Sequence, residues 1–214
     1  MPHICLLLSG AALLLNGLAT LGHLPRRDAA VLSLVVGCTQ LVLGVVLVGG
    51  ASDAPLPTAA GMFLFGLTYV YAGLDVLLEL GSRGLGWFCG MVAFVGLLLA
   101  GAWLGTDPLL AVLWLGWAVL WGLLFLSMAW GSERLEPFIG WSLLLASQTT
   151  ATIPAFLGLA GIWPYSPAAA WVAAAVLCLV FATARVLARR GTAPHRAKAA
   201  GVAAGVAAGK QAAS

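Results

Sequence analysis

Charged residues are scarce in this chain. They make up 8% of its 214 residues, whereas 62% are hydrophobic, so the sequence lacks the polar coat of a water-soluble domain. In lipid, backbone amide groups must be hydrogen-bonded within the spanning structure, and long apolar runs without period-two alternation favour helices over a barrel. The composition therefore predicts an all-α integral membrane protein.

The sequence also lacks the residue groups that carry covalent or metal chemistry. Its three histidines, His3, His23 and His195, lie at or beyond the ends of the apolar runs, and no phosphate loop occurs. Its four cysteines lie inside apolar runs at spacings that match no disulfide or metal pattern, which is typical of packing residues. We expect no enzyme activity, no catalytic residue, no metal site and no cofactor.

Apolar segments long enough to cross a hydrocarbon core, which takes about 20 residues, are separated by short turn-rich connectors. They cover residues 4–22, 30–50, 59–80, 85–105, 109–130, 138–161 and 168–188. This pattern predicts a bundle of seven transmembrane helices.

The positive charges follow the alternation of these segments. All ten Lys and Arg lie in the first, third and fifth connectors, near the end of the last span, or beyond it. By the positive-inside rule, the N-terminus is expected outside the cell and the C-terminus in the cytoplasm. The net charge of +3 therefore reflects the orientation of the chain in the membrane, and no nucleic-acid partner is expected. From 191 to 214 the Ala/Gly-rich basic composition predicts a disordered tail.

The third span carries polar and aromatic residues at helical spacing. They share one face, which should avoid lipid: Phe65, Thr68, Tyr69, Ala72, Asp75 and Glu79. Asp75 and Glu79 lie near the inner end of the span. Each could face a water-filled cavity or extend to the cytoplasmic interface.

Two further spans and one buried amide complete the candidate site. The fifth span has a stripe of Trp114, Trp117, Trp121 and Phe125, and the sixth has Ser147, Gln148, Thr149, Thr150, Thr152 and Pro154. Pro154 has no N–H, so it frees the carbonyl of Thr150 from the helical ladder. Asn16 lies alone in the first span. These side chains could line a pathway or hydrogen-bond neighbouring helices.

Several of these segments resemble the urea and amide channel family of bacteria, the UreI/AmiS type. The resemblance rests on residues 16–17, 65–72, 114–121 and 150–155, and residues 84–89 look closer to the amide branch. It implies a six-helix protomer over 1–162 that encloses its own pore and assembles as a hexamer. Residues 163–190 would add a seventh helix.

The family resemblance also implies function. Such a protein passes urea or small amides passively across the bacterial inner membrane and serves a cytoplasmic amidase or urease. Its pore would be lined by Asn16, Phe65, Thr68, Tyr69, Trp114, Trp117 and Trp121.

The sequence departs from the family pattern at three places. Ala146 stands where the urea branch has a glutamate, so Gln148 or the Thr150 carbonyl is expected to replace it, and Asp75 places a carboxyl group at the inner mouth. The 51–58 connector has no histidine, which predicts a channel without acid gating. Two alternatives stay open: a proton-coupled transporter that uses Asp75, and a non-transporting membrane subunit.

Overall fold

The computed structural model describes residues 2–50 and 56–211, with side chains to residue 190. Its helical elements are α1 (Pro2–Thr20), α2 (Arg26–Gly50), α3 (Leu56–Leu78), α4 (Arg83–Trp103), α5 (Pro108–Met128), η1 (Glu133–Leu135), α6 (Glu136–Ala146), η2 (Ser147–Thr152), α7 (Ile153–Leu159) and α8 (Pro167–Gln211). Seven segments of the described chain are long and apolar enough to cross a membrane. The chain is thus an all-α, multi-pass membrane protein, as predicted.

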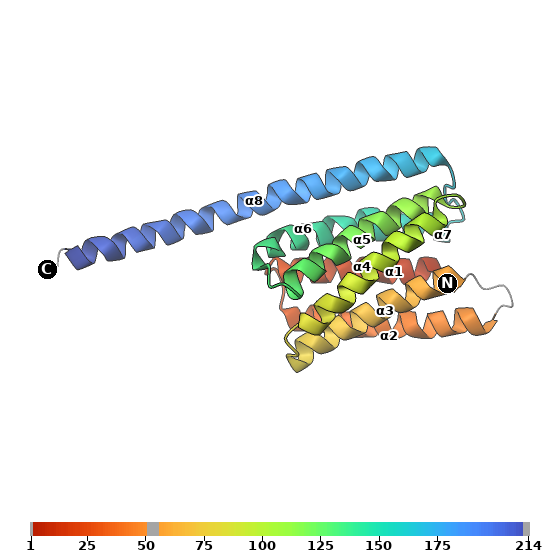
Figure 1. Ribbon diagram of the computed structural model, residues 1–214, viewed down its shortest axis with the longest axis horizontal. Helices are drawn as coiled ribbons and strands as arrows, with labels where there is room; N and C mark the ends of the chain where they lie inside the picture. Colours follow the sequence, from red (N-terminus) through yellow and green to blue (C-terminus); the bar gives the residue numbers. More distant parts are fainter. Residues whose placement is uncertain (1, 51–55, 212–214) are drawn as a thin grey trace.

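The spanning helices lie side by side, with α2 beside α3 and α4 beside α5 (Figure 1). Helix α1 packs against α2 and α6, and α8 lies along the outer side of α5 and α6. Glycines permit the closest approaches: a Cβ added at Gly37 of α2 would lie 2.6 Å from the carbonyl oxygen of Gly66 in α3. Small residues at such contacts are typical of packed membrane helices.

The sixth span is not one regular helix. It consists of α6, the π-helical turn η2 and the short helix α7, and the backbone N–H of Ile153 donates to the carbonyl of Gln148, five residues earlier. Pro154 cannot donate a backbone bond, so the hydrogen-bond ladder changes register just before it. The π turn gives the residues of η2 a different angular spacing from a continuous α-helix.

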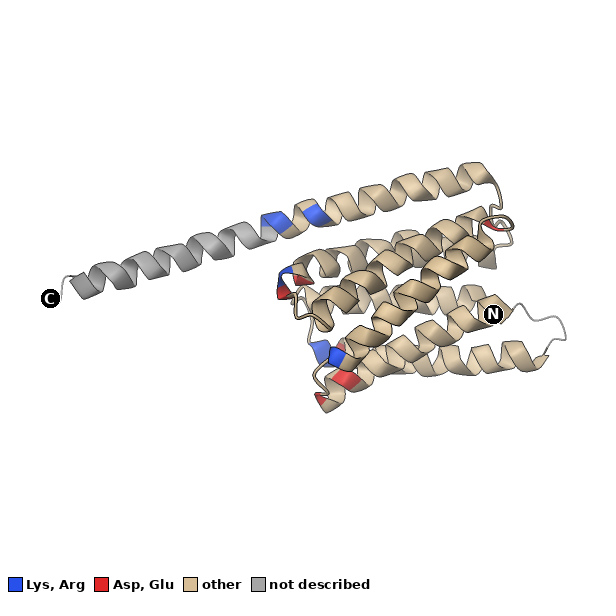
Figure 2. Ribbon diagram, in the orientation of Figure 1, with Lys and Arg blue, Asp and Glu red and all other residues tan. Residues whose placement is uncertain are grey.

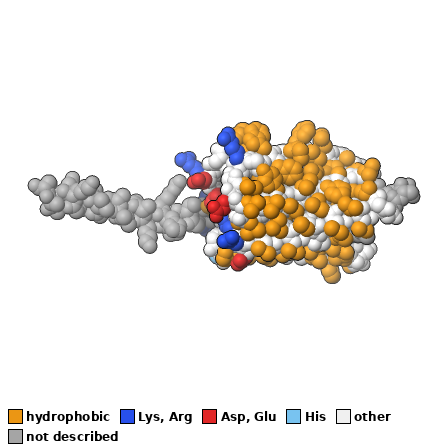
Figure 3. All heavy atoms as spheres, turned by 90° about the horizontal axis from the view of Figure 1, so that it is seen from below, with side chains coloured by type: hydrophobic (Ala, Val, Ile, Leu, Met, Phe, Trp, Pro, Cys, Tyr) orange, Lys and Arg blue, Asp and Glu red, His pale blue; other side chains and the backbone are white. Residues whose placement is uncertain are grey.

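The surface of the bundle separates apolar and charged side chains. Hydrophobic side chains cover most of the face in Figure 3, and apolar residues such as Val42, Phe94 and Trp171 are exposed. Among the described side chains, the arginines gather at one end of the bundle (Figure 2). This distribution is that of a protein whose sides face lipid.

Helix α8 continues to Gln211, so its backbone is helical where a disordered tail was predicted from residue 191. Alanine has the highest helix propensity, and the segment extends a helix already formed by the last span. The side chains beyond residue 190 lie outside the described residues. So does most of the 51–58 connector, on which the prediction about acid gating rests.

Candidate functional site

The described side chains line a cavity toward each end of the bundle. The first, of about 370 Å³, is at the end where α1 and α5 begin. The second, of about 330 Å³, is at the end where Arg26 and Glu133 lie. No described residue lines both cavities, so a barrier separates them.

The barrier is aromatic, and we call its four rings (Phe65, Trp114, Trp117 and Trp121) the aromatic neck. The Phe65 ring stacks on Trp121, with centroids 4.9 Å apart and planes at 12°. It meets Trp117 edge-on at 5.1 Å and Trp114 at 5.3 Å. Phe65 lines the first cavity and Trp121 the second, so their stack is the boundary between the two.

Hydrogen bonds from neighbouring helices fix the two innermost indoles. Trp121 Nε1 donates to Thr68 Oγ1 at 3.2 Å, and Trp117 Nε1 donates to Thr150 Oγ1 at 3.1 Å. Both threonine hydroxyls in turn donate to a carbonyl of their own helix. Buried indole N–H groups need such acceptors. Because these N–H groups are occupied, Trp117 and Trp121 offer a solute their ring faces.

Asn16 and Tyr69 line the second cavity. The Asn16 amide nitrogen donates to the Ala12 carbonyl and to Ser33 Oγ, each at 2.8 Å. These bonds use both of its N–H groups, which leaves the amide oxygen as its acceptor. The Tyr69 hydroxyl lies 3.5 Å from the Ser9 carbonyl oxygen. The second cavity therefore has polar side chains held by neighbouring helices.

Gln148 does not join this group. It is exposed, lines neither cavity, and donates to its neighbour Ser147 at 3.2 Å. The structure thus does not bring Gln148 to either cavity, and it lies in the π turn, where regular helical spacing does not apply. Thr150 is buried but also lines neither cavity, and its hydroxyl accepts the N–H of Trp117.

Asp75 is buried in the wall of the second cavity and holds the turn between α3 and α4. It accepts the backbone N–H of Ser82 at 2.8 Å and also the Ser82 hydroxyl. Ser82 has a left-handed backbone with φ of 58°, a conformation that such bonds stabilise. Glu79 is exposed, so only Asp75 faces the interior.

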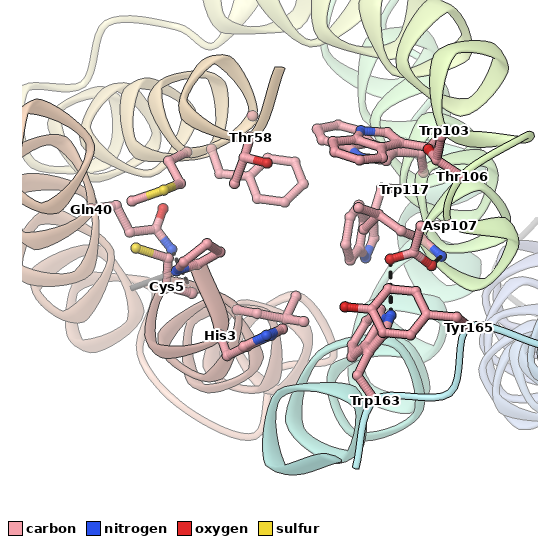
Figure 4. Close-up of a pocket in the computed structure, with 17 residues that line it drawn as sticks. His3, Cys5, Gln40, Thr58, Trp103, Thr106, Asp107, Trp117, Trp163 and Tyr165 are labelled. Atoms are coloured by element: carbon pink, nitrogen blue, oxygen red, sulfur yellow. Dashed lines mark hydrogen bonds between the residues drawn. The ribbon is translucent and has the colours of Figure 1, made fainter. Parts of the chain in front are cut away.

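The first cavity contains polar residues that the sequence analysis missed (Figure 4). Asp107 caps α5 by accepting the Leu110 N–H at 3.0 Å, and its other oxygen accepts Trp163 Nε1 at 2.9 Å. The His3 ring lies 5.4 Å from that of Trp163. The Asp107-Pro108 pair is a recognisable helix start and could have identified the cap. The ring contacts join distant segments and have no local signal.

Together, the fold and the site define a helical membrane protein with two cavities and an aromatic neck between them. The chain belongs to the AmiS/UreI family of transporters, whose family model matches residues 1–162. This confirms the family indicated by the sequence.

Its relatives include two putative transporters and a urea channel. It is 42% identical to a putative transporter protein AmiS2 of Rhodococcus erythropolis, over 88% of this chain and 93% of the relative. It is 36% identical to a putative amidate substrates transporter protein of Mycolicibacterium smegmatis, over 86% and 89%. The crystal structure of the urea channel of Helicobacter pylori superposes with a TM-score of 0.67 at 26% identity, covering 77% of this chain and 100% of that one.

Proposed function

We propose that this protein is a passive channel for urea or short-chain aliphatic amides. The observation that carries the proposal is a pair of cavities within one protomer, with Phe65 in the wall of one stacked on Trp121 in the wall of the other. Its relatives, among them a putative transporter of amidate substrates and a urea channel, agree with this solute class.

Urea and small amides are planar, neutral and rich in hydrogen-bonding groups. Ring faces at the neck can accept such a plane, while the polar groups of the two cavities replace part of its hydration. At the neck a hydrated ion meets aromatic ring faces instead of oxygen ligands that could replace its water, so pore width and lining polarity give selectivity. Rapid exit requires weak binding of the solute, with dissociation constants in the millimolar range or above. This corresponds to a binding free energy of about 4 kcal/mol or less in magnitude.

The residues that we propose as the pore lining share direct access to the cavities or form the neck between them. They are Asn16, Phe65, Thr68, Tyr69, Trp114, Trp117 and Trp121. Asp75 is assigned to the turn at the inner mouth. Both its oxygens are engaged by Ser82, which argues against a proton-coupled mechanism at this carboxyl group.

We assign the arginine-bearing end of the bundle to the cytoplasm of a bacterium and the first cavity to the outside of the inner membrane, by the positive-inside rule. The proposed organisation is a six-helix channel unit over 1–162, an extra helix over 163–190 and a basic extension over 191–214. A homo-hexamer that serves a cytoplasmic amidase or urease completes the proposal. We propose no acid gating, because the 51–58 connector has no histidine.

The test is uptake of radiolabelled acetamide and urea into proteoliposomes, with and without an imposed proton gradient. A passive channel brings the internal concentration to the external one and no higher, at a rate unchanged between external pH 5 and 7. Accumulation above the external concentration that disappears with the gradient would establish coupled transport instead. Uptake equal to that of empty vesicles would support the non-transporting subunit.

A further inference from the structure

Gln40 is an amide side chain buried in the wall of the first cavity. It lies on α2, is 0% exposed and lines this cavity together with Cys5, Met62 and Trp114. Its oxygen, Oε1, has no hydrogen-bond partner among the described residues. Native proteins satisfy nearly all buried polar atoms, so an orphaned acceptor beside a cavity calls for a ligand.

The orientation of this amide is set by its nitrogen. Gln40 Nε2 donates to the carbonyl of Cys5 and to Ser9 Oγ, each at 2.8 Å. A flipped amide would place its oxygen against the Cys5 carbonyl, which can only accept. Both N–H groups are therefore occupied, and Figure 4 shows the oxygen turned away from Cys5, toward the side where Thr58 lies.

A second unpartnered group occurs in the same cavity. Trp103 Nε1 is buried and has no acceptor in the described part of the chain. Trp103 lies across the cavity from Gln40 (Figure 4). It differs from Trp117 and Trp121, whose N–H groups are held by threonines. The wall of the first cavity thus contains one buried acceptor and one buried donor without partners among the described residues, both uncharged.

We propose that the first cavity is a recognition site for primary amides, in which Gln40 Oε1 accepts the solute N–H and Trp103 Nε1 donates to the solute carbonyl. This inference rests on the proposed channel function and names the groups that select its solute. Neutral partners of both kinds match a molecule that carries both a donor and an acceptor.

The proposal is tested with three isomeric competitors of radiolabelled acetamide influx into proteoliposomes. Propionamide, N-methylacetamide and N,N-dimethylformamide have the same atoms but two, one and no N–H groups. In the wild type, inhibition should weaken in that order. Gln40→Met should weaken inhibition by propionamide about fivefold and leave inhibition by dimethylformamide unchanged. A fivefold change corresponds to about 1 kcal/mol, at 1.4 kcal/mol per tenfold.

Two further variants separate recognition from structure. Ser9→Ala removes one partner of Gln40 Nε2 but leaves Oε1 in place, so the order of the isomers should persist. Trp103→Phe keeps an aromatic ring without the N–H. It should weaken inhibition by all three isomers to the same extent, since each isomer has a carbonyl. It also tests the site if Gln40→Met fails to elute from size exclusion in detergent as the wild type does.

The outcomes distinguish this site from the channel itself. Wild-type influx no faster than in empty vesicles would overturn the channel and the site together. Two results would overturn the site alone, provided that the wild type shows influx. One is an order of inhibition by the three isomers that is the same in Gln40→Met as in the wild type. The other is inhibition by the isomers that Trp103→Phe leaves unchanged. In that case the two orphaned groups bind only water.

Discussion

The threonine that holds an indole of the aromatic neck gives the sharpest energetic prediction. Thr68→Val keeps the shape of the side chain but removes the acceptor of Trp121 Nε1. Trp121 is 2% exposed, so its N–H would be left without a partner inside the bundle. A buried donor that loses its partner costs about 1–3 kcal/mol. Thr68→Val should therefore destabilise the protein although no carbon contact is lost.

The hydrogen bond is isolated by a double-mutant cycle of Thr68→Val and Trp121→Phe, measured by thermal unfolding in detergent. In the Trp121→Phe background the indole N–H is absent, so Thr68→Val should lower the free energy of unfolding much less than in the wild type. The effects of the two substitutions on stability should therefore not add. Couplings of this kind between membrane helices average about 0.6 kcal/mol and reach about 1.7. A matched cycle of Thr150→Val and Trp117→Phe should give a similar value. Additivity of both pairs within about 0.3 kcal/mol would refute the idea that these hydrogen bonds fix the neck.

Three further predictions concern residues around the pathway. Asp75→Asn can still accept the Ser82 N–H, so acetamide influx should keep its wild-type rate and pH profile; loss of influx in this variant would favour proton coupling. Gln148→Ala should change neither influx nor isomer selectivity, because Gln148 lies on the exposed surface. Reduced influx in this variant would indicate that Gln148 lines the pore. Arg26→Gln breaks the 3.3 Å ion pair with Glu136, whose side chains are 65% and 42% exposed. Unfolding in detergent should therefore shift by no more than about 1 kcal/mol, and less in high salt.

The two helix faces that form the aromatic neck could be predicted from sequence because each follows helical periodicity. Phe65 and Thr68 lie on one helical face, and Trp117 and Trp121 form one stripe, so each helix presents its set to a neighbour. In the structure the N–H groups of Trp117 and Trp121 donate to threonines of other helical segments. What periodicity cannot give is which helix provides the acceptor.

The remaining features depend on backbone irregularities and on contacts between distant segments. The π turn before Pro154 changes the spacing around Gln148, and a regular helical projection does not contain it. The role of Asp75 depends on the left-handed backbone of Ser82, seven residues later. Gln40 is a lone amide in an apolar run, and the orientation of its side chain depends on a hydrogen bond to the Cys5 carbonyl of another helix.

Conduction through the neck is the central claim, and the size of residue 65 tests it most directly. The measurement is stopped-flow light scattering of proteoliposomes in an acetamide gradient, comparing wild type, Phe65→Ala and Phe65→Trp at equal protein content. The stacking of Phe65 on Trp121 at the boundary of the two cavities predicts fastest entry for alanine, intermediate entry for phenylalanine and slowest entry for tryptophan. Equal rates for three correctly folded proteins, or rates no faster than empty vesicles, would contradict a pathway through this neck.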